Sequence, residues 1–282
     1  MARSFAFARR YKRNIPAVIG LGIVILVLLL AVLAPVLRPG DPWAITGQPY
    51  LWPGQDARFP LGTDVLGRDI LSGILHGASV SLFIGVASAV VAGLLGTALG
   101  AISGYYGGWI DDVLMRIAEA FQTVPSFLQA LIIVALFTPS SITIVAAISA
   151  ISWPGVARLV RAETKRVRSA DFVSACYTFG MGNLRIIASQ ILPNCLAPLI
   201  VTVSVIVASA ILIEAGLSFL GFGDPTQLSW GTMISIGRGT LRSAWYMSAI
   251  PGLAILVTVL GINLASEGLN DALNPHLRER LS

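Results

Sequence analysis

The sequence predicts an all-α membrane protein with six transmembrane helices, and its composition and its apolar runs carry this prediction. Of its 282 residues, 55% are hydrophobic and 12% are charged, whereas a soluble domain has about 25% charged residues. Several segments stay apolar over the roughly 18 residues or more that a helix needs to cross about 30 Å of hydrocarbon. A large soluble core would need helices with polar faces, and most of these segments have none.

We expect the six spans at residues 15–37, 79–104, 117–137, 142–157, 197–213 and 247–266. The first span follows a basic segment, as the apolar part of a secretory signal does. It is too long for a cleaved signal and no A-x-A site follows it, so we expect it to be retained. Pro125, Pro154 and Pro198 lie inside the third, fourth and fifth spans, where they bend helices or serve packing alone.

Two details of the second span and the connection before it predict local structure. In the second span, Gly96, Gly100 and Gly104 form a GxxxG stripe, which we expect to pack against another helix of the same chain. In the polar connection before that span, Asp64 is placed to cap a helix that begins at Val65.

Two further connections differ in character. Residues 105–116 predict a short loop whose aromatic side chains lie at the membrane surface. Residues 214–246 are rich in glycine and aromatic residues, and they are too broken for an ordinary span. They predict a helix that lies at the membrane interface or a partly re-entrant loop.

The distribution of basic residues predicts the orientation in the membrane. Six spans place both termini on one side, and 14 of the 19 lysines and arginines then fall on that side. Because cytoplasmic loops are enriched in lysine and arginine, the termini and the stretch 158–194 are expected in the cytoplasm. The basic charge is thus a signal of topology, and it gives no reason to expect nucleic-acid binding.

The residue types inside the spans exclude several classes of activity. No ionisable residue lies in the central part of any predicted span, which argues against a carrier that uses carboxylate or histidine relays, though not against one that binds ions through backbone carbonyls. The two lysines, Lys12 and Lys165, do not follow a glycine, so the sequence has no phosphate-binding loop of the GxxxxGK[ST] type. Two cysteines and two histidines lack the spacing of a metal or redox site. We expect neither an enzyme nor a metal site in this chain.

The basic stretch 158–194 predicts a short helix on the protein surface. Asp171 or Ser169 is placed to cap a helix over residues 172–179, and Gly180 is placed to end it at the C′ position. Phe172, Cys176 and Phe179 fall on one apolar edge of that helix, and they lie at positions i, i+4 and i+7. Such an edge fits a groove on a cytosolic protein. It equally fits a helix that rests on lipid headgroups, and spacing alone leaves both readings open.

The segment SACYTFGMGNLRIIASQILPN resembles the EAA signature of ABC-importer permeases. The matching positions are Ser174, Ala175, Cys176, Gly180, Leu192 and Pro193. Ser174 stands where the signature has glutamate, and Cys176 where it has a second alanine. LGTDVLGRDILS, ISGYYGGWIDD, EAGLSFLGFG and LNDALNP, in this order along the chain, are similar to blocks of the dipeptide/oligopeptide/nickel permease family, and within it to the C-type subunit.

The resemblance implies six transmembrane helices with a cytoplasmic coupling helix, the type I ABC importer permease fold. It implies a heterodimer with a B-type permease, two cytosolic ATPase subunits that bind ATP and Mg²⁺, and an extracytoplasmic solute-binding protein; this chain itself would hold no cofactor. The positions implied for ATPase docking are Asp171, Phe172, Ser174, Ala175, Cys176, Phe179, Gly180, Leu192 and Pro193.

The expected organisation has three parts. Residues 1–77 form an N-terminal arm, the first span and an extracytoplasmic loop; residues 78–267 form the permease domain with an EAA-like loop at 169–193; residues 268–282 form a cytoplasmic tail. The expected location is the cytoplasmic membrane of a bacterium or archaeon. The resemblance makes di- and oligopeptides the first choice of cargo, with nickel or metal chelates, glutathione and opine-like solutes as alternatives. A secondary carrier or channel, and a scaffold that only anchors a cytosolic partner, are the alternatives outside this family.

Overall fold

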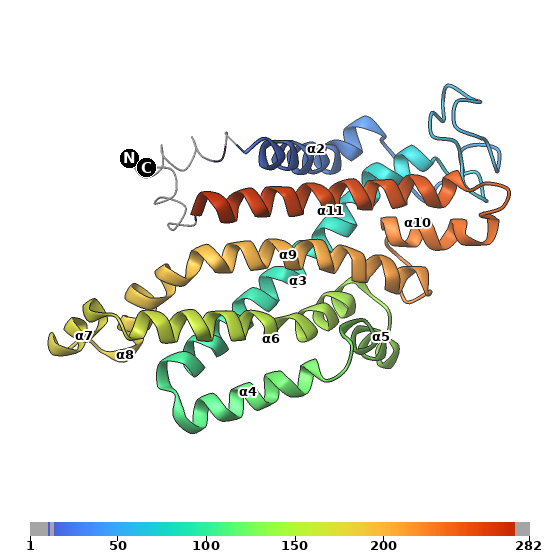
Figure 1. Cartoon of the computed structure of the whole chain (residues 1–282). Coiled ribbons are helices and arrows are strands. Elements are labelled where there is room, and N and C mark those ends of the chain that lie inside the picture. Colours follow the sequence, from blue (N-terminus) through green and yellow to red (C-terminus); the bar gives the residue numbers. More distant parts are fainter. Residues whose placement is uncertain (1–10, 12–13, 274–282) are drawn as a thin grey trace.

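The computed structural model describes Tyr11 and residues 14–273, and its long regular elements are helices (Figure 1). The basic residues at positions 3–13 lie outside the described part of the chain, and so do residues 274–282 of the tail. The elements are α2 (Ile15–Leu37), α3 (Ile70–Tyr106), α4 (Gly108–Gln122), α5 (Ser126–Leu136), α6 (Ser141–Arg168), α7 (Asp171–Thr178), α8 (Asn183–Ile186), a π-helical turn (Ile187–Ile191), α9 (Leu192–Phe219), α10 (Trp230–Gly237), a short 3₁₀ turn (Arg238–Thr240) and α11 (Tyr246–Leu273).

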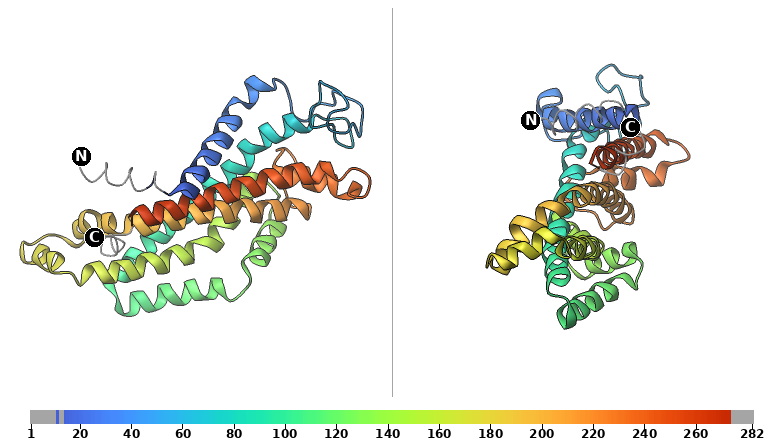
Figure 2. Two further views of the ribbon diagram at one scale, coloured as in Figure 1. Left: turned by 45° about the horizontal axis from the view of Figure 1, so that its top comes forward. Right: turned by 60° about the vertical axis from the view of Figure 1, so that its left-hand side comes forward.

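The predicted fold class is confirmed. Within the described residues, five helices are long and apolar enough to cross a membrane, and the bent pair α4 and α5 makes a sixth span if it is counted as one. The first span, α2, has the predicted bounds. Figures 1 and 2 show α6, α9 and α11 running roughly along one direction, with α9 and α11 side by side, and Figure 1 shows α3 crossing them obliquely.

The third span differs from the prediction. The expected loop at 105–116 is mostly helical, since α4 begins at Gly108, directly after a turn at Gly107. The chain then breaks before Pro125 and α5 leaves at 86° to α4. Proline disfavours the helical conformation of the residue before it and has no N–H to donate. A helix–break–helix therefore replaces the single span expected at 117–137.

The fourth and fifth spans are longer than predicted. Helix α6 continues through Pro154 to Arg168, so the beginning of the basic stretch 158–194 is helix and not loop. Its last turn carries Lys165, Arg166 and Arg168, and cations are favoured at the negative end of a helix dipole. The fifth span begins before Pro193, because α8 and the π-helical turn lead into α9 without a break, and it ends at Phe219.

Helix α3 is the centre of the fold. It contacts α2, α4, α6, α9, α10 and α11. Gly96, Gly100 and Gly104 face α6, where a Cβ atom added at Gly96 would lie 2.5 Å from the Cβ of Val156 and one added at Gly104 would lie 2.7 Å from the carbonyl oxygen of Arg161. Only glycine admits this close approach of two helices.

The connection at 214–246 forms part of the core. Its first residues, Glu214–Phe219, complete α9. The short helix α10 follows and packs against α3, α9 and α11. The side chain of Trp230 is 2% exposed and its Nε1 donates to the carbonyl oxygen of Ile74 at 3.0 Å. The expected short helix is present, but it is packed into the bundle more tightly than a helix that only rests at an interface.

Residues 38–69 fold into a compact cap between α2 and α3, and here the expected role of Asp64 is wrong. The N-cap of α3 is Asp69, whose carboxylate accepts from the N–H of Leu71 at 3.0 Å. Gly67 has φ of +89°, so the chain turns there and no helix can begin at Val65. Asp64 instead closes this turn, since its Oδ1 accepts from the N–H of Leu66 at 2.8 Å.

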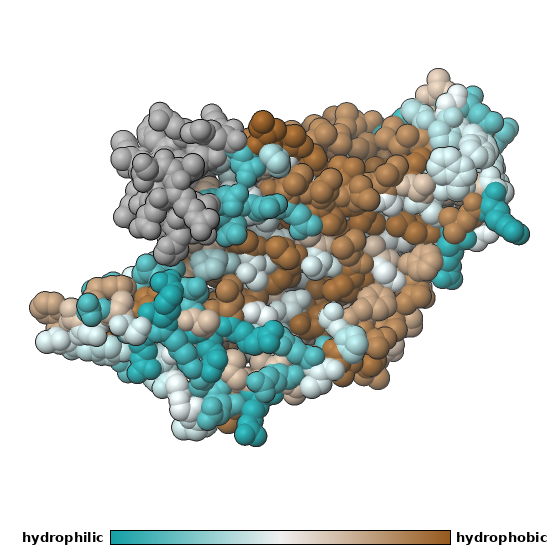
Figure 3. Space-filling view, in the orientation of Figure 1, coloured by the Kyte–Doolittle hydropathy of each residue, from teal (hydrophilic) through white to brown (hydrophobic). Residues whose placement is uncertain are grey.

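The surface divides into an apolar middle and two polar ends. Figure 3 shows a broad hydrophobic face over the middle of the bundle, with hydrophilic residues at the end that carries α7 and at the end that carries the cap. Exposed apolar side chains on α2 include Val32 and Val36, which are 74% and 76% exposed. We call these ends the α7 end and the cap end. Helix α7 therefore lies beyond the apolar part of the surface.

Candidate functional site

Helix α7 is the predicted surface helix, but its amino terminus differs from the prediction. Its N-cap is Ala170, and no side chain caps it. Asp171 is the first residue of the helix, where its negative charge suits the positive end of the dipole. The hydroxyl of Ser169 donates to the carbonyl oxygen of Arg166 at 2.9 Å and so belongs to the end of α6.

The carboxyl end of α7 has the geometry expected of a glycine at C′. Gly180 has φ of +75°, a conformation that residues with a Cβ rarely adopt. Its N–H donates to the carbonyl oxygen of Tyr177 at 2.9 Å, and the N–H of Met181 donates to that of Cys176 at 3.1 Å. These two bonds are the Schellman motif, so Gly180 fixes where the helix stops and where the chain turns back.

The three residues of the predicted apolar edge do not share one environment. Phe172 is 46% exposed and Phe179 is 84% exposed, whereas Cys176 is half-buried and packs against a hydrophobic cluster. Val173, which the sequence did not single out, is fully buried and holds α7 to that cluster. The edge therefore splits into an outward pair of phenylalanines and an inward anchor.

Other residues complete the exposed face. Ser174 and Ala175 are exposed on α7, and the carbonyl oxygen of Ser174 accepts from the Thr178 hydroxyl at 3.1 Å. Tyr177 is 42% exposed and Leu184, on α8, is 78% exposed. Sequence analysis missed these two. Both are large side chains close to Phe179 in the sequence, and that was the signal that could have found them. The i, i+4, i+7 spacing of Phe172, Cys176 and Phe179 does not include them.

The remaining predicted positions lie at the start of α9, away from the free face of α7. Leu192 is half-buried and packs against the same cluster as Val173, and Pro193 is exposed in the first turn of α9. These two residues belong to the base on which α7 and α8 stand.

A chain of hydrogen bonds joins α7 to the end of α3. The hydroxyl of Tyr177 donates to the hydroxyl oxygen of Tyr105 at 2.9 Å, and the Tyr105 hydroxyl donates to Oδ1 of Asn183 at 2.9 Å. The guanidinium carbon of Arg168 lies 5.4 Å from the centre of the Tyr105 ring, within the range of a cation–π contact. The last residues of α3 and α6 and the first residue of α8 thus meet at one phenol.

A buried carboxylate ties together the helices beneath α7. Asp111, on α4, is 5% exposed, and its carboxylate accepts hydrogen bonds from the Ser103 hydroxyl, the Arg161 guanidinium and the Lys165 ammonium group. The Lys165 Nζ lies 2.6 Å from Oδ2. Arg161 and Lys165 therefore do more than set topology, because they compensate a buried charge. No spacing rule links Asp111 to residues so far along the chain.

A second buried carboxylate lies near the cap end. Glu214 is 1% exposed inside α9, and its Oε1 accepts from the hydroxyls of Ser218 at 2.7 Å and Ser229 at 2.6 Å. Oε2 has no hydrogen-bond partner among the described residues. Ser229 also caps α10 by accepting from the N–H of Thr232 at 3.1 Å. Sequence analysis ended the fifth span one residue before Glu214 and so missed it.

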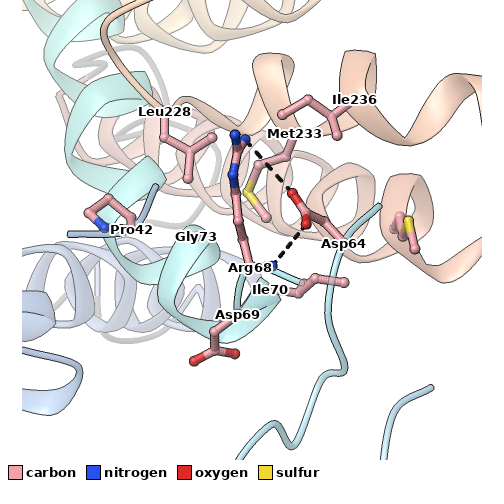
Figure 4. A pocket seen from close by; sticks show the side chains of 10 residues that line it. Pro42, Asp64, Arg68, Asp69, Ile70, Gly73, Leu228, Met233 and Ile236 are labelled. Atoms are coloured by element: carbon pink, nitrogen blue, oxygen red, sulfur yellow. Dashed lines mark hydrogen bonds and ion pairs between the residues drawn. The ribbon is translucent and has the colours of Figure 1, made fainter. Parts of the chain in front are cut away.

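A small pocket beneath the cap is too small to hold a transported solute. Figure 4 shows Arg68 between Leu228 and Met233, with its guanidinium directed at Asp64. Its Nη1 lies 3.9 Å from Oδ2 of Asp64, and the guanidinium carbon lies 4.7 Å from the centre of the Trp43 ring. The free space is about 20 Å³, room for one water molecule. These two contacts join residues of the cap to one another.

Comparison with known proteins covers nearly the whole chain. Residues 96–279 match the family described as binding-protein-dependent transport system inner membrane component. Residues 6–55 match the N-terminal transmembrane domain of oligopeptide transport permease C. The first match alone spans more than half of the chain.

Curated relatives are similar over the same length. The chain is 40% identical over 275 residues to the dipeptide transport system permease protein DppC of Haemophilus influenzae, with 95% of this chain and 93% of that protein covered. It is 37% identical over 276 residues to the oligopeptide transport system permease protein OppC of Bacillus subtilis, with 96% and 88% covered. With this likeness, a type I permease bundle and an exposed helix at the predicted EAA-like position, the chain belongs to the family of inner membrane components of binding-protein-dependent transport systems, the permeases of ABC importers.

Proposed function

We propose that this chain is one permease subunit of an ATP-driven importer that carries di- and oligopeptides across the cytoplasmic membrane. Its nearly full-length likeness to peptide permeases supports the cargo. Among these, the Pseudomonas aeruginosa protein, 40% identical over 279 residues, is named a di/tripeptide permease. Nickel or metal chelates, glutathione and opine-like solutes are the alternative cargoes.

The observation that carries the proposal is the exposed face of α7. Phe172 and Phe179 project from a helix whose other face is held by Val173, at the polar α7 end of the molecule. Large apolar side chains outside the hydrocarbon region favour a protein partner, and the face suits insertion of a short helix into a groove. We assign this face to a cytosolic ATPase subunit. ATP and Mg²⁺ then bind in that partner, and this chain does not hydrolyse nucleotide.

The orientation follows from the same assignment. The α7 end faces the cytoplasm, and the cap of residues 38–69 faces the opposite side. A solute-binding protein would deliver the peptide there, and a B-type permease would complete the pathway as the second half of a heterodimer. Binding of ATP would draw the two ATPase subunits together and displace α7, which would switch the helical bundle between its two openings.

Reconstitution tests this proposal. The chain with its partner permease, ATPase subunits and binding protein should take up a labelled dipeptide in liposomes only when ATP is present. The chain alone should take up none under a proton or sodium gradient. Uptake by the chain alone would establish the rival, a secondary carrier. ATP-driven uptake of a nickel chelate in place of peptide would overturn the assignment of the cargo but not that of an ATP-driven importer.

A variant of Gly180 tests the docking helix in the same assay. Gly180→Val places a Cβ at φ of +75° and should distort the end of α7. ATP-driven uptake should be lost, while the amount of chain inserted in the membrane stays unchanged. Gly182→Val is the control, because this exposed glycine has a negative φ and open space around its Cβ position. Full uptake by Gly180→Val would contradict the assignment of α7.

A further inference from the structure

The phenol of Tyr105 has a bonding pattern that no other side chain would reproduce in place. It accepts from Tyr177, on α7, and donates to Asn183, the first residue of α8, with both oxygen–oxygen distances 2.9 Å. A hydroxyl has one hydrogen and can accept as well as donate, so both capacities are used at once. The side chain is 3% exposed. Removal of this one oxygen would break both links of α7 and α8 to α3.

The packing around Tyr105 makes the contact specific. Its ring lies in the same buried cluster as Val173 of α7 and Ile186 of α8. The neighbouring Tyr106 is 45% exposed and meets Tyr105 only through its ring, with the ring centres 5.2 Å apart. The hydroxyl of Tyr105 thus links α3 to α7 and α8, whereas Tyr106 meets Tyr105 through its ring alone. Tyr106 therefore serves as a matched control for substitution of Tyr105.

Helix α3 differs from the other long helices in having no proline. Prolines lie inside α2, α6, α9 and α11, and the chain is broken before Pro125 between α4 and α5. Helix α3 runs for 37 residues without one, a length of about 55 Å at 1.5 Å per residue. Proline is the main cause of kinks in helices. Among the long helices of the described residues, α3 is therefore the one that no proline interrupts, and it reaches from the α7 end to the cap end.

At its other end, α3 holds α10. The backbone N–H of Trp230 donates to the hydroxyl oxygen of Ser81 at 3.2 Å, and its Nε1 donates to the carbonyl oxygen of Ile74 at 3.0 Å. Helix α10 also packs on α9 and α11, so it joins three spans close to the cap. A shift of α3 along or about its axis would therefore displace α10 through these two hydrogen bonds.

We propose that Tyr105 is the positioning residue that fixes α7 to α3, and that α3 carries the displacement of α7 to α10 at the opposite end of the bundle. This inference rests on the proposed function, in which an ATPase subunit moves α7. It adds a route: the force enters α3 through the Tyr177–Tyr105–Asn183 chain. The π-helical turn after α8 gives α9 a deformable start. Helix α6, which leads into α7, contains Pro154, so α3 is the connection that has neither feature.

The first test needs no partner. Hydrogen exchange of the backbone amides in 171–186 is measured on the purified chain in detergent. Tyr105→Phe should raise the exchange rate there by about 25-fold, because it removes two hydrogen bonds and each shifts a local equilibrium roughly fivefold. Tyr177→Phe should raise it less, because the bond to Asn183 remains. Tyr106→Phe should leave it unchanged. No change in Tyr105→Phe, or an equal change in Tyr106→Phe, would overturn the anchoring role.

The second test uses the assembled transporter. Addition of ATP to the wild-type complex should change the exchange of amides in α10, and Tyr105→Phe should lose this response. Dipeptide transported per ATP hydrolysed should fall several-fold, while the ATPase subunits stay bound because the outer face of α7 is intact. An unaltered response of α10 in Tyr105→Phe would overturn the route through α3. Failure of the proposed function would give a different result, because no ATPase subunit would then bind the wild-type chain.

Discussion

The carboxylate of Asp111 on α4 is bound by the guanidinium of Arg161 on α6, with Nη2 and Oδ2 2.6 Å apart. The side chain of Asp111 is 6% exposed and that of Arg161 is 33% exposed, so the acid is inside the protein and the base reaches it from the rim. Lys165, one turn further along α6, binds the same carboxylate. Ser103 of α3, which lies two residues before Tyr105, also donates to the carboxylate of Asp111. This cluster fixes the beginning of α4 against α6.

Asp111→Asn should destabilise the chain. It removes the negative charge and leaves two cations with one neutral acceptor. Because Arg161 and Lys165 are partly exposed, we expect a loss of about 2 kcal/mol, less than for a fully buried pair. The measurement is the free energy of unfolding in a detergent–denaturant titration. Asp112→Asn is the control, since Asp112 is exposed on the next position of α4. Equal stability of the two variants would refute the role of the cluster.

The close approach of Gly100 to α6 gives a test of the packing of α3 on α6. Gly100→Ala should cost about 1–3 kcal/mol of unfolding free energy, because a Cβ there would meet the backbone of Ala157. Gly155→Ala, on α6, is the matched control: it lies inside a helix with nothing within 4 Å of the added Cβ, so it should be neutral or stabilising by about 1 kcal/mol. The same titration measures both. A neutral Gly100→Ala would show that the helices are not in close contact.

Glu214 should tolerate loss of charge and not loss of its acceptor oxygen. Glu214→Gln keeps a carbonyl oxygen for the hydroxyls of Ser218 and Ser229, whereas Glu214→Ala leaves both without it. We expect Glu214→Ala to lose about 2 kcal/mol and to raise hydrogen exchange in α10, with a smaller effect in Glu214→Gln. Equal damage in both variants would show that the charge matters, and no damage in either would remove Glu214 from the link between α9 and α10.

Asp224 predicts a dependence of stability on pH. Partial burial would raise the pKa of Asp224, but hydrogen bonds from Thr226 and Ser141 outweigh it, and the pKa lies below its usual range. Ser141 begins α6, and its N–H and hydroxyl donate to Oδ2 of Asp224 at 2.8 Å and 2.7 Å. A carboxylate with a lowered folded-state pKa stabilises the fold above its unfolded pKa, and this contribution is lost as the pH falls through the folded value.

The measurement compares the wild type with Asp224→Asn. The difference in unfolding free energy should be constant above about pH 4, near the unfolded pKa of aspartate, and should shrink as the pH falls further. Comparison with the variant cancels the titration of the other carboxylates. A difference that grows on acidification would contradict the assigned sign.

The sequence predicted those features that depend on local composition. Helix α2 has the predicted bounds, because an uninterrupted apolar run follows Asn14, whose side chain accepts from the N–H of Ala17 at 3.2 Å. Gly180 ends α7 as expected, since the C′ position favours glycine for its backbone alone. The fourth and fifth spans had wrong bounds, because α6 and α9 continue as helices beyond the predicted ends. Surrounding helices compensate for the hydrogen bonds lost at Pro154 and Pro198.

The parts that the sequence missed are contacts between distant residues. Asp111 meets Arg161 and Tyr105 meets Tyr177 across separations of 50 and 72 residues. Each partner taken alone reads as a surface residue, so a periodic pattern cannot pair them. The cap shows the same limit: Asp64 and Asp69 are equally good capping residues by type, and the turn at Gly67 decides between them.

The central claim is that an ATPase subunit binds the outer face of α7, and the most direct measurement is the amount of ATPase that co-purifies with the chain. The double variant Phe172→Ala and Phe179→Ala removes the two exposed rings and leaves Val173 in place. Trp109→Ala is the control, since Trp109 on α4 is 74% exposed and lies outside α7. We expect the double variant to lose at least about tenfold in bound ATPase, because hot-spot residues at the centre of an interface each contribute more than about 1 kcal/mol. The control should bind ATPase as the wild type does. Undiminished ATPase on the double variant would contradict the account.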